Sequence, residues 1–398
     1  MANKLWNGEI TAKGIHTATS VYTFKELRKG LFKTLGGGFD TLKPGTPLYN
    51  RAAQIELDAL LFSALKNNRL CAAMSSLKSF GVDKETFMRE FKLAFDTSYI
   101  TQLDAELDHV RAVTESAKQW SEAVERAADG FDWLKYHTMQ DERVRDEHRP
   151  WDNIKLPLTH SFWRTHYPPN GYRCRCYATS DFEGPEVHPL ESELKANPLA
   201  AEFRRNFGAD GKAFTGSPTH PYIKDFDFAA MRPLNLQINA LKTELQAYTQ
   251  VKGTAVYEHP LINPAEVEMN RKQAVRLSKT TGAKITLTPD AKLTGFKNPD
   301  SIAAKKPVEF KHITGSNVTN TIKRDVSHAG KQGAHTVCLF IETEAYNKAA
   351  VIRALKAVAG QPENYTGVKL IVLQLDFLET DILIERDRIG DFDFDMLP

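Results

Sequence analysis

The sequence predicts an α+β protein with an N-terminal helical region, a small domain rich in Trp, His and Cys, and a C-terminal domain of strands and helices. Its 398 residues exceed one ordinary domain and suit two or three. Apolar residues recur at helical spacing up to about residue 129, and short strand-like apolar runs alternate with helical patterns after about residue 283. Helices followed by such a mixed region are typical of α+β architecture.

Shifts in composition indicate the domain boundaries. Glycines and prolines before Tyr49 predict an extended arm, in which Phe24–Leu35 fits one short basic helix. The expected segments are an arm over 1–48, a helical region with the Trp/His/Cys-rich domain over 49–182, a Pro-rich linker with a short helix over 183–255, a basic domain over 256–376 and an acidic tail over 377–398.

The clearest helix is predicted between residues 98 and 129. Its apolar residues are spaced by three and four and form one stripe, made of Ile100, Leu103, Leu107, Val110, Val113, Ala117, Trp120 and Val124. The pair Asp129-Gly130 is a helix-ending signal. Because the stripe needs a partner, we expect a helical bundle or a helix docked on the next domain.

Charge is unevenly distributed although the net charge of the whole chain is only +2. Residues 251–360 hold 17 Lys and Arg against 9 Asp and Glu, a net of +8. Residues 361–398 hold 3 against 9, a net of −6. A basic block attracts polyanions such as nucleic acid, and an acidic tail can screen that block, so RNA and DNA are both candidate partners.

Cysteine usage and hydropathy bear on location. The four cysteines, Cys71, Cys174, Cys176 and Cys338, do not indicate a disulfide framework. The polar start has no signal-peptide core, and no apolar run reaches the roughly eighteen residues that span a bilayer. We therefore expect synthesis and folding in a reducing cytoplasm and no membrane partner.

The stretch Trp133–Tyr177 is dense in Trp, His, Pro, Arg and Cys and has no helical period. Its motif elements, in order, are Asp141-Glu142-Arg143-Val144-Arg145, His148, Trp151, Leu156-Pro157-Leu158, Phe162-Trp163, Tyr167-Pro168-Pro169-Asn170-Gly171 and Cys174-Arg175-Cys176. The prolines predict a rigid turn, because each fixes φ, and Gly171 allows a positive φ. An aromatic core is expected from Trp151, Phe162, Trp163 and Tyr172. Forked donors for carboxylates or phosphates come from Arg143, Arg145, Arg173 and Arg175.

In these elements the sequence resembles the phage Mu F-type head-morphogenesis family. One departure is Asp152-Asn153, which stands where a glycine-containing turn is expected, although Asn tolerates turn geometry. The resemblance implies a structural minor head protein that meets the portal and other head proteins in low copy number during assembly in the host cytoplasm. It also implies that the protein can enter the virion head.

Zinc is a possible cofactor of this small domain. Cys174 and Cys176 offer sulfur ligands, and His148 and His166, with His160 as an alternative, offer nitrogen. The other interpretation is a metal-free core with buried cysteines and histidines bonded to the backbone. The sequence leaves both open.

The C-terminal domain is predicted to place helices on one sheet. Helices are expected over 264–280, from about Ser316 and over 347–358, and strands over 284–287, 336–341 and 368–375. Glu309 and Lys311 alternate on a strand and so share a face, with Asp300 in the preceding loop. Two carboxylates holding Mg²⁺ beside a lysine are typical of metal-dependent nucleases.

The run from Glu309 to Glu342 resembles the C-terminal tRNase domains of contact-dependent inhibition and other polymorphic bacterial toxins, which lie near the barnase/EndoU/colicin/RelE-like nuclease fold. The residues that carry the resemblance are Glu309, Lys311, Thr314-Gly315, Asn320-Thr321-Ile322 and Lys331-Gln332. It implies an RNase effector domain, and with it a cognate immunity protein as a further partner.

A metal-free route is equally open, in which Glu309 or His312 removes the proton of the ribose 2′-OH and a cation stabilises the transition state. His312 points to the strand face opposite Lys311, so Glu309 and Lys311 are preferred. The residues expected to hold substrate are Lys305, Lys306, Thr314, Ser316, Asn320, Thr321, Lys323, Arg324, Lys331 and Gln332. The competing function is a purely structural head protein whose basic domain holds packaged DNA without catalysis.

Overall fold

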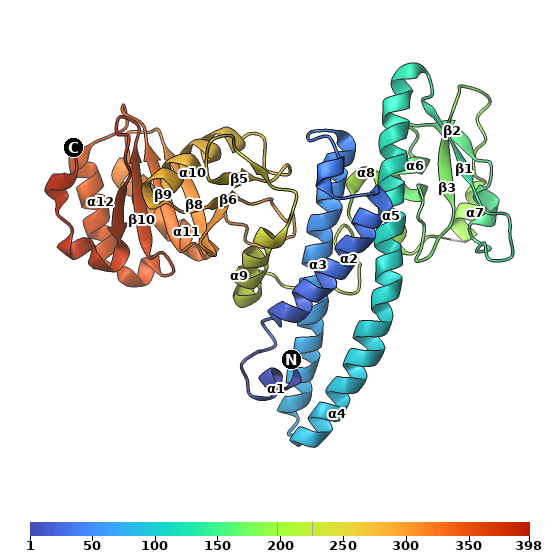
Figure 1. Cartoon of the computed structure of the whole chain (residues 1–398), viewed down its shortest axis with the longest axis horizontal. Coiled ribbons are helices and arrows are strands. Elements are labelled where there is room, and N and C mark those ends of the chain that lie inside the picture. Colours follow the sequence, from blue (N-terminus) through green and yellow to red (C-terminus); the bar gives the residue numbers. More distant parts are fainter. Residues whose placement is uncertain (197, 225) are drawn as a thin grey trace. The chain divides into compact units, whose positions relative to one another are not determined.

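The computed structural model describes residues 1–196, 198–224 and 226–398. The chain divides into two compact units, 1–226 and 227–398, which are described separately (Figure 1). Unit 1 combines long helices with a small sheet and unit 2 is built on one large sheet, so the predicted α+β class is confirmed. Within the described part of the chain, no helix is both long and apolar enough to cross a bilayer.

Long helices dominate the first half of unit 1 (blue to cyan in Figure 1). They are α1 (Ala2–Trp6), α2 (Thr17–Leu35), α3 (Pro47–Ser79), α4 (Lys84–Ala94) and, after a π-helical turn over 95–100, α5 (Thr101–Arg126). The expected helical region is therefore present. The short helix predicted over Phe24–Leu35 is present as part of the longer α2. The arm before Tyr49 is packed rather than extended, because Phe24, Leu27 and Leu31 form a stripe that is buried as α2 packs on α3 and α5.

Helix α3 is the central helix of this layer. Pro47 opens it at a position where its missing N–H costs nothing, and the Thr46 hydroxyl accepts a hydrogen bond from the Tyr49 amide at 3.3 Å. Its middle is buried on all sides, polar residues included. Lys66 is one of these, and its ammonium lies 2.8 and 2.7 Å from the two carboxylate oxygens of Glu106 on α5.

The predicted stripe on α5 is buried in its middle and exposed at both ends. Val110, Val113 and Ala117 are fully buried, whereas Ile100 and Val124 are exposed. The helical segment ends at Gly130, whose φ of 86° is left-handed, as the Asp129-Gly130 signal predicts.

The Trp/His/Cys-rich domain is a three-stranded antiparallel sheet beside α5. Its strands, in spatial order, are β2 (Lys155–Pro157), β1 (Trp133–His137) and β3 (Tyr177–Asp181), and helix α6 (Phe162–His166) follows β2. Trp151, Phe162 and Trp163 are buried in its core, as expected. The expectation that Tyr172 lies in that core is wrong, because its ring packs on His109 and Phe203 outside it.

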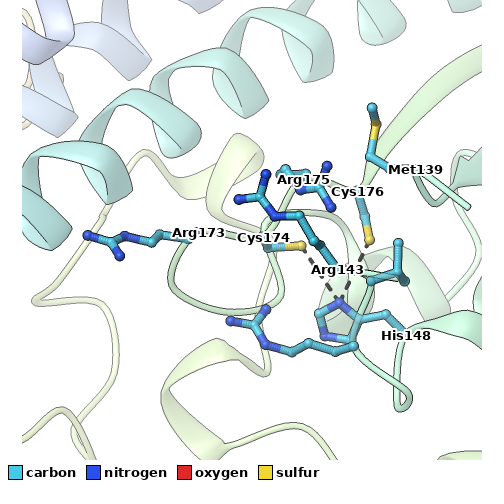
Figure 2. A pocket seen from close by; sticks show the side chains of 9 residues that line it. Met139, Arg143, His148, Arg173, Cys174, Arg175 and Cys176 are labelled. Atoms are coloured by element: carbon cyan, nitrogen blue, oxygen red, sulfur yellow. Dashed lines mark hydrogen bonds between the residues drawn. The ribbon is translucent and has the colours of Figure 1, made fainter. Parts of the chain in front are cut away.

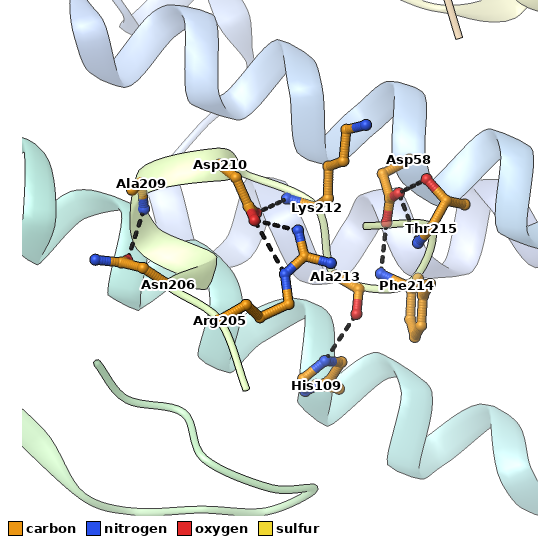
Figure 3. A network of polar contacts seen from close by, with 10 residues as sticks. All are labelled: Asp58, His109, Arg205, Asn206, Ala209, Asp210, Lys212, Ala213, Phe214 and Thr215. Atoms are coloured by element: carbon orange, nitrogen blue, oxygen red, sulfur yellow. Dashed lines mark hydrogen bonds and ion pairs between the residues drawn. The ribbon is translucent and has the colours of Figure 1, made fainter. Parts of the chain in front are cut away.

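The segment 198–224, placed in the predicted linker, packs on the helices of unit 1. It contains α8 (Phe207–Asp210), and Figure 3 shows how polar contacts attach the chain around it to α3 and α5. Asp58 of α3 accepts hydrogen bonds from the amides of Phe214 and Thr215, and the Nε2 atom of His109 donates to the carbonyl of Ala213 at 3.0 Å. Before it lies the short α7 (Glu191–Ala196).

Unit 2 is an eight-stranded mixed sheet in the order β11-β10-β9-β8-β7-β6-β5-β4. The strands are β4 (Thr249–Gln250), β5 (Val256–Glu258), β6 (Ile285–Leu287), β7 (Ser301–Ala303), β8 (Lys306–Ile313), β9 (Thr336–Ile341), β10 (Leu370–Leu375) and β11 (Ile382–Glu385). Its helices are α9 (Arg232–Leu241), α10 (Val267–Thr281), α11 (Val318–Gln332) and α12 (Lys348–Gly360). The strands and helices expected here are present within a few residues.

Helices cover both faces of this sheet. One core joins Val337 and Leu339 of β9 to residues of α11 and α12, and a second joins Cys338 of β9 to Ala274 and Leu277 of α10. Since neighbouring strand residues face opposite ways, the two cores lie on opposite faces. Ile313 belongs to the first core, which places the odd-numbered residues of β8 on the α11 face.

The last 22 residues, expected as an acidic tail over 377–398, belong to this fold. Strand β11 pairs antiparallel with β10, and Ile384, Ile389 and Leu397 are buried in the core under α12. The acidic residues of 377–398 and the basic residues of 251–360 therefore belong to the same folded unit. The net charge of 251–398 is +8 reduced by 6, or +2, so the overall charge of the folded unit attracts nucleic acid far less than the basic block alone.

Candidate functional sites

The first candidate site lies in the loops of the small domain (Figure 2). Cys174 and Cys176 precede β3, and His148 comes from the long loop between β1 and β2. The Nδ1 atom of His148 lies 3.8 Å from the sulfur of Cys174 and 3.7 Å from that of Cys176. All three candidate ligand atoms lie within 4.8 Å of one another.

The other histidines named from the sequence lie apart from this cluster. The ring of His166 stacks on Phe162, and its Nδ1 atom pairs with the Thr165 hydroxyl at 2.8 Å. His160 accepts a hydrogen bond from the Phe162 amide. Among the described residues, the group therefore contains three of the four predicted ligands, His148, Cys174 and Cys176, without His166.

Local contacts hold the cysteine segment in place. The guanidinium of Arg175 forms two hydrogen bonds, of 2.8 and 2.6 Å, with the carboxylate of Asp141. Arg145 donates to the carbonyl of Tyr172 and lies so close to Gly171 that an added Cβ would meet it at 2.7 Å. Gly171 does not use the positive φ that glycine allows, and Arg173 has a positive φ instead, at 59°.

Contacts of Asp152 and the backbone conformation of Asn153 hold the loop that carries His148. Asp152 accepts hydrogen bonds from the amide and hydroxyl of Thr138 at 2.7 and 3.1 Å. Asn153 has a left-handed φ of 65°, so the asparagine takes the turn geometry expected of a glycine at this departure from the family pattern.

A pocket of about 210 Å³ opens beside the cluster. It is lined by Met139, Arg143, Val144, Arg145, His148, Arg173, Cys174, Arg175 and Cys176 (Figure 2). The Cys176 thiol and the His148 imidazole lower the pKa of Cys174 to about 4 against the effect of burial. Cys174 and burial together raise the pKa of Cys176, because a second thiolate so close is unfavourable.

The second candidate site lies in unit 2 and joins Asp300, Glu309 and Lys311. The β7–β8 register pairs Ser301 with Val308, so its next step sets Asp300 opposite Glu309. The ammonium of Lys311 lies 2.8 Å from a carboxylate oxygen of Glu309, and the amide of Phe310 donates to Asp300 at 2.7 Å. The three side chains predicted to act together therefore meet on the α11 face of the sheet.

Burial governs the electrostatics of these three groups. Glu309 is 2% exposed, and burial, with the Asp300 carboxylate adding in the same direction, raises its pKa to about 7. Burial also raises the pKa of Asp300. For Lys311, burial acts to lower the pKa, but the Glu309 and Asp300 carboxylates prevail and raise it. One oxygen of Glu309 is buried without a hydrogen-bond partner among the described residues.

The residues predicted to bind substrate do not form a single site. A cavity of about 510 Å³ is lined by Asn320, Lys323, Arg324 and Lys331, together with residues 363–366 and Ser327. A different cavity, of about 360 Å³, brings Gln332 beside Asp300. Lys305 and Lys306 lie at the β7–β8 turn, and Thr314 and Ser316 follow the opposite end of β8, with Thr321 in α11. His312 points away from Lys311 and contacts Glu342 at 2.8 Å, as strand alternation predicts.

Lys242 was not among the residues predicted from the sequence to have a functional role. It is fully buried, and its ammonium donates to the carbonyl of Pro289 at 2.8 Å and to the side chain of Asn298 at 2.6 Å. Burial lowers its pKa to about 7. Lys242 thereby holds the loop that leads to Asp300. A lysine next to the apolar stripe of a short helix gives no sequence signal for this role.

Comparison with known proteins concerns the first candidate site. Residues 81–179 match the family described as Phage Mu protein F like protein. Over 49 residues the chain is 43% identical to a protein of Escherichia phage Mu named for capsid assembly (capsid assembly protein F). That stretch is 12% of this chain and 11% of the relative, so the chain matches about a tenth of the relative's length.

No solved structure matches the chain. The family match lies entirely within unit 1, so the likeness of unit 2 to toxin nucleases stays a prediction. The resemblance seen from Asp141 to Cys176 is confirmed by the matched range. The Mu F-like domain of this chain is therefore residues 81–179, the stretch that resembles the Phage Mu F-like family and contains His148, Cys174 and Cys176.

Proposed function

We propose that this protein acts in phage head assembly through its Mu F-like domain. The observation that carries the proposal is the match of residues 81–179, supported by 43% identity over 49 residues to a phage Mu protein named for capsid assembly. Portal and other head proteins are the partners to expect, and the virion head is the destination.

The test is genetic and biochemical. In the phage genome that encodes the chain, disrupting its gene should lower the yield of DNA-filled heads seen by electron microscopy, and the intact gene supplied in trans should restore it. The protein should also be recovered from purified heads by mass spectrometry. Normal heads without the protein would count against the proposal.

A second candidate function for unit 2 is RNA cleavage at Asp300, Glu309 and Lys311. The observation favouring it is their convergence on one sheet face, beside a cavity of about 360 Å³ that Asp300 lines. With a pKa of about 7, Glu309 is suited to exchange a proton at neutral pH. Because Glu309 is 2% exposed, a ribose must reach it through local opening beside Lys311, whose side chain is 20% exposed.

Mg²⁺ is a possible cofactor of this second function, held by the Asp300 and Glu309 carboxylates, and the metal-free route is the alternative. The full-length protein should cleave RNA, with tRNA as the first substrate to test. Glu309→Gln should remove the general base and Lys311→Met the cation that stabilises the transition state, and each should lower the cleavage rate by roughly two to four powers of ten. Glu344→Gln, at an exposed position of the same unit, is the matched control. Cleavage that persists in EDTA would favour the metal-free route.

An immunity protein is expected only if unit 2 cleaves RNA. Binding of RNA or DNA by the wild-type chain without any cleavage, with or without Mg²⁺, would instead favour a structural head protein that holds packaged DNA. In that case Glu309→Gln should leave binding unchanged, because a passive binder has no use for a buried carboxylate.

A further inference from the structure

We propose that His148, Cys174 and Cys176 bind a zinc ion whose fourth coordination position opens toward the arginine-lined pocket of Figure 2. This site goes beyond a role in head assembly, which by itself calls for no metal. Two sulfurs and one imidazole nitrogen are a donor set that zinc prefers over harder cations such as Mg²⁺.

The spacing of the donor atoms is close to that of a formed zinc centre. Zn–S bonds of about 2.3 Å and a Zn–N bond of about 2.0–2.1 Å at tetrahedral angles put sulfur and nitrogen roughly 3.6 Å apart. The observed separations from His148 Nδ1 are 3.8 Å to Cys174 and 3.7 Å to Cys176. Both sulfur-to-nitrogen separations therefore match zinc coordination to a few tenths of an ångström, and the two sulfurs lie within 4.8 Å of each other.

Packing holds the imidazole in the orientation that zinc requires. His148 is 2% exposed and its ring stacks on Trp151, with centroids 4.8 Å apart and planes 23° apart. This stacking presents the Nδ1 edge to both sulfurs. The Nε2 atom has no hydrogen-bond partner among the described residues, so Trp151 does the orienting that a second-shell acceptor commonly does.

The cysteines are presented by contacts that do not involve the sulfurs. Both sulfurs lie within 3.8 Å of His148 Nδ1, while the side chain of Arg175, between them in the chain, turns toward Asp141. Because the Arg175–Asp141 pair fixes the segment independently, a cysteine can be replaced without removing the contacts that position the backbone.

Three protein ligands leave one of four tetrahedral positions for another ligand. The pocket of about 210 Å³ beside the sulfurs is lined by four arginines, and Arg175 and Arg145 are engaged with Asp141 and the Tyr172 carbonyl. Water or a small anion drawn by the arginines can complete the coordination. Zinc centres of three protein ligands characteristically keep such an open position.

The test begins with the metal content of the full-length protein, purified without a histidine tag or chelators. Plasma mass spectrometry should find about one zinc per chain, and His148→Gln, Cys174→Ala and Cys176→Ala should each lower this at least tenfold. Cys338→Ala in unit 2 and His188→Gln on the surface of unit 1 are matched controls and should keep the wild-type content. Zinc below a tenth per chain in the wild type would overturn the proposal.

Cobalt substitution of the wild type supplies a readout that does not depend on any variant folding. Bound Co²⁺ should show thiolate-to-cobalt charge transfer and the visible bands of tetrahedral coordination, and azide should shift those bands because the fourth position is open. Absence of thiolate charge transfer would overturn the assignment of Cys174 and Cys176 as ligands. Bands unmoved by azide would overturn the open position.

Discussion

Asp58 of α3 accepts a hydrogen bond of 2.7 Å from the backbone amide of Phe214, 156 residues further along the chain. The same carboxylate accepts from the amide and the hydroxyl of Thr215 (Figure 3). It is fully buried, and burial raises its pKa although each of these donors acts to lower it. Asp58 therefore anchors the segment after α8 to the helices of unit 1.

We predict that Asp58→Ala lowers the free energy of unfolding of unit 1 by roughly 2–4 kcal/mol, because it leaves two buried amides without an acceptor. Tryptophan fluorescence during urea unfolding is a selective probe, since all five tryptophans lie in unit 1, at 6, 120, 133, 151 and 163. Asp104→Ala on the exposed side of α5 is the control and should change the unfolding free energy by less than about 0.5 kcal/mol. Equal effects of the two substitutions would contradict the anchoring role.

The buried pair of Lys66 and Glu106 allows a double-mutant test. Glu106→Leu alone should destabilise unit 1 by roughly 3–5 kcal/mol, because it strands the Lys66 ammonium in the core. Lys66→Met with Glu106→Leu should recover most of that loss, since an apolar pair of similar volume needs no desolvated charge. Additive losses in the urea midpoints would show that packing, and not the stranded charge, sets the cost.

Trp163 is a core residue of the Mu F-like domain, 1% exposed, with its indole N–H directed at the carbonyl of Leu156 at 3.4 Å. Trp163→Ala should cost roughly 3–5 kcal/mol, because it removes a large buried side chain and leaves a cavity. Phe80→Ala removes an aromatic ring that is 81% exposed and should be nearly neutral in the same thermal melts. An unchanged melting temperature for a soluble Trp163→Ala variant would contradict the core placement.

Much of the fold could be predicted because local patterns carry it. Apolar spacing predicts which face of an element is buried, and it does so for the stripe from Leu103 to Ala117 and for the apolar run Thr336–Ile341. The hydrogen bond between Phe214 and Asp58 could not be predicted, because a single aspartate within a helical pattern is normally expected to be exposed to solvent. The role of β11 was missed for a similar reason: the acidic residues after Ile384 outweighed its short apolar pattern.

Some residues of each candidate site could be predicted from the sequence and others could not. Alternation on a strand sufficed to place Glu309 with Lys311, and spacing sufficed to pair Cys174 with Cys176. Which histidine joins the cysteines depends on the path of the loop between β1 and β2, about which the sequence contains no periodic signal. His148 and His166 were therefore equivalent in the sequence, and only the fold separates them.

The raised pKa of Glu309 has a definite consequence for stability in unit 2. A carboxyl whose pKa rises on folding, here from about 4.5 to about 7, favours the folded state while it is protonated. Its contribution is fully present below the unfolded pKa and is lost as pH rises through the folded pKa. We therefore predict that the free energy of unfolding of unit 2 falls between pH 4.5 and pH 8, with about 3 kcal/mol of the fall coming from Glu309.

Amide hydrogen exchange read by mass spectrometry on peptides of β8, β9 and β10 suits this measurement, because unit 2 has no tryptophan. Glu309→Gln cannot ionise, so its β8 peptides should show a much flatter pH dependence of protection, with the remaining slope coming from Asp300, whose pKa is raised in the same direction. Glu344→Gln, at an exposed position, should keep the wild-type slope. If Glu309→Gln and wild type lose protection in parallel as pH rises, the Glu309 carboxyl does not carry the raised pKa. The proton-exchange role proposed for it in RNA cleavage would then lose its physical basis as well.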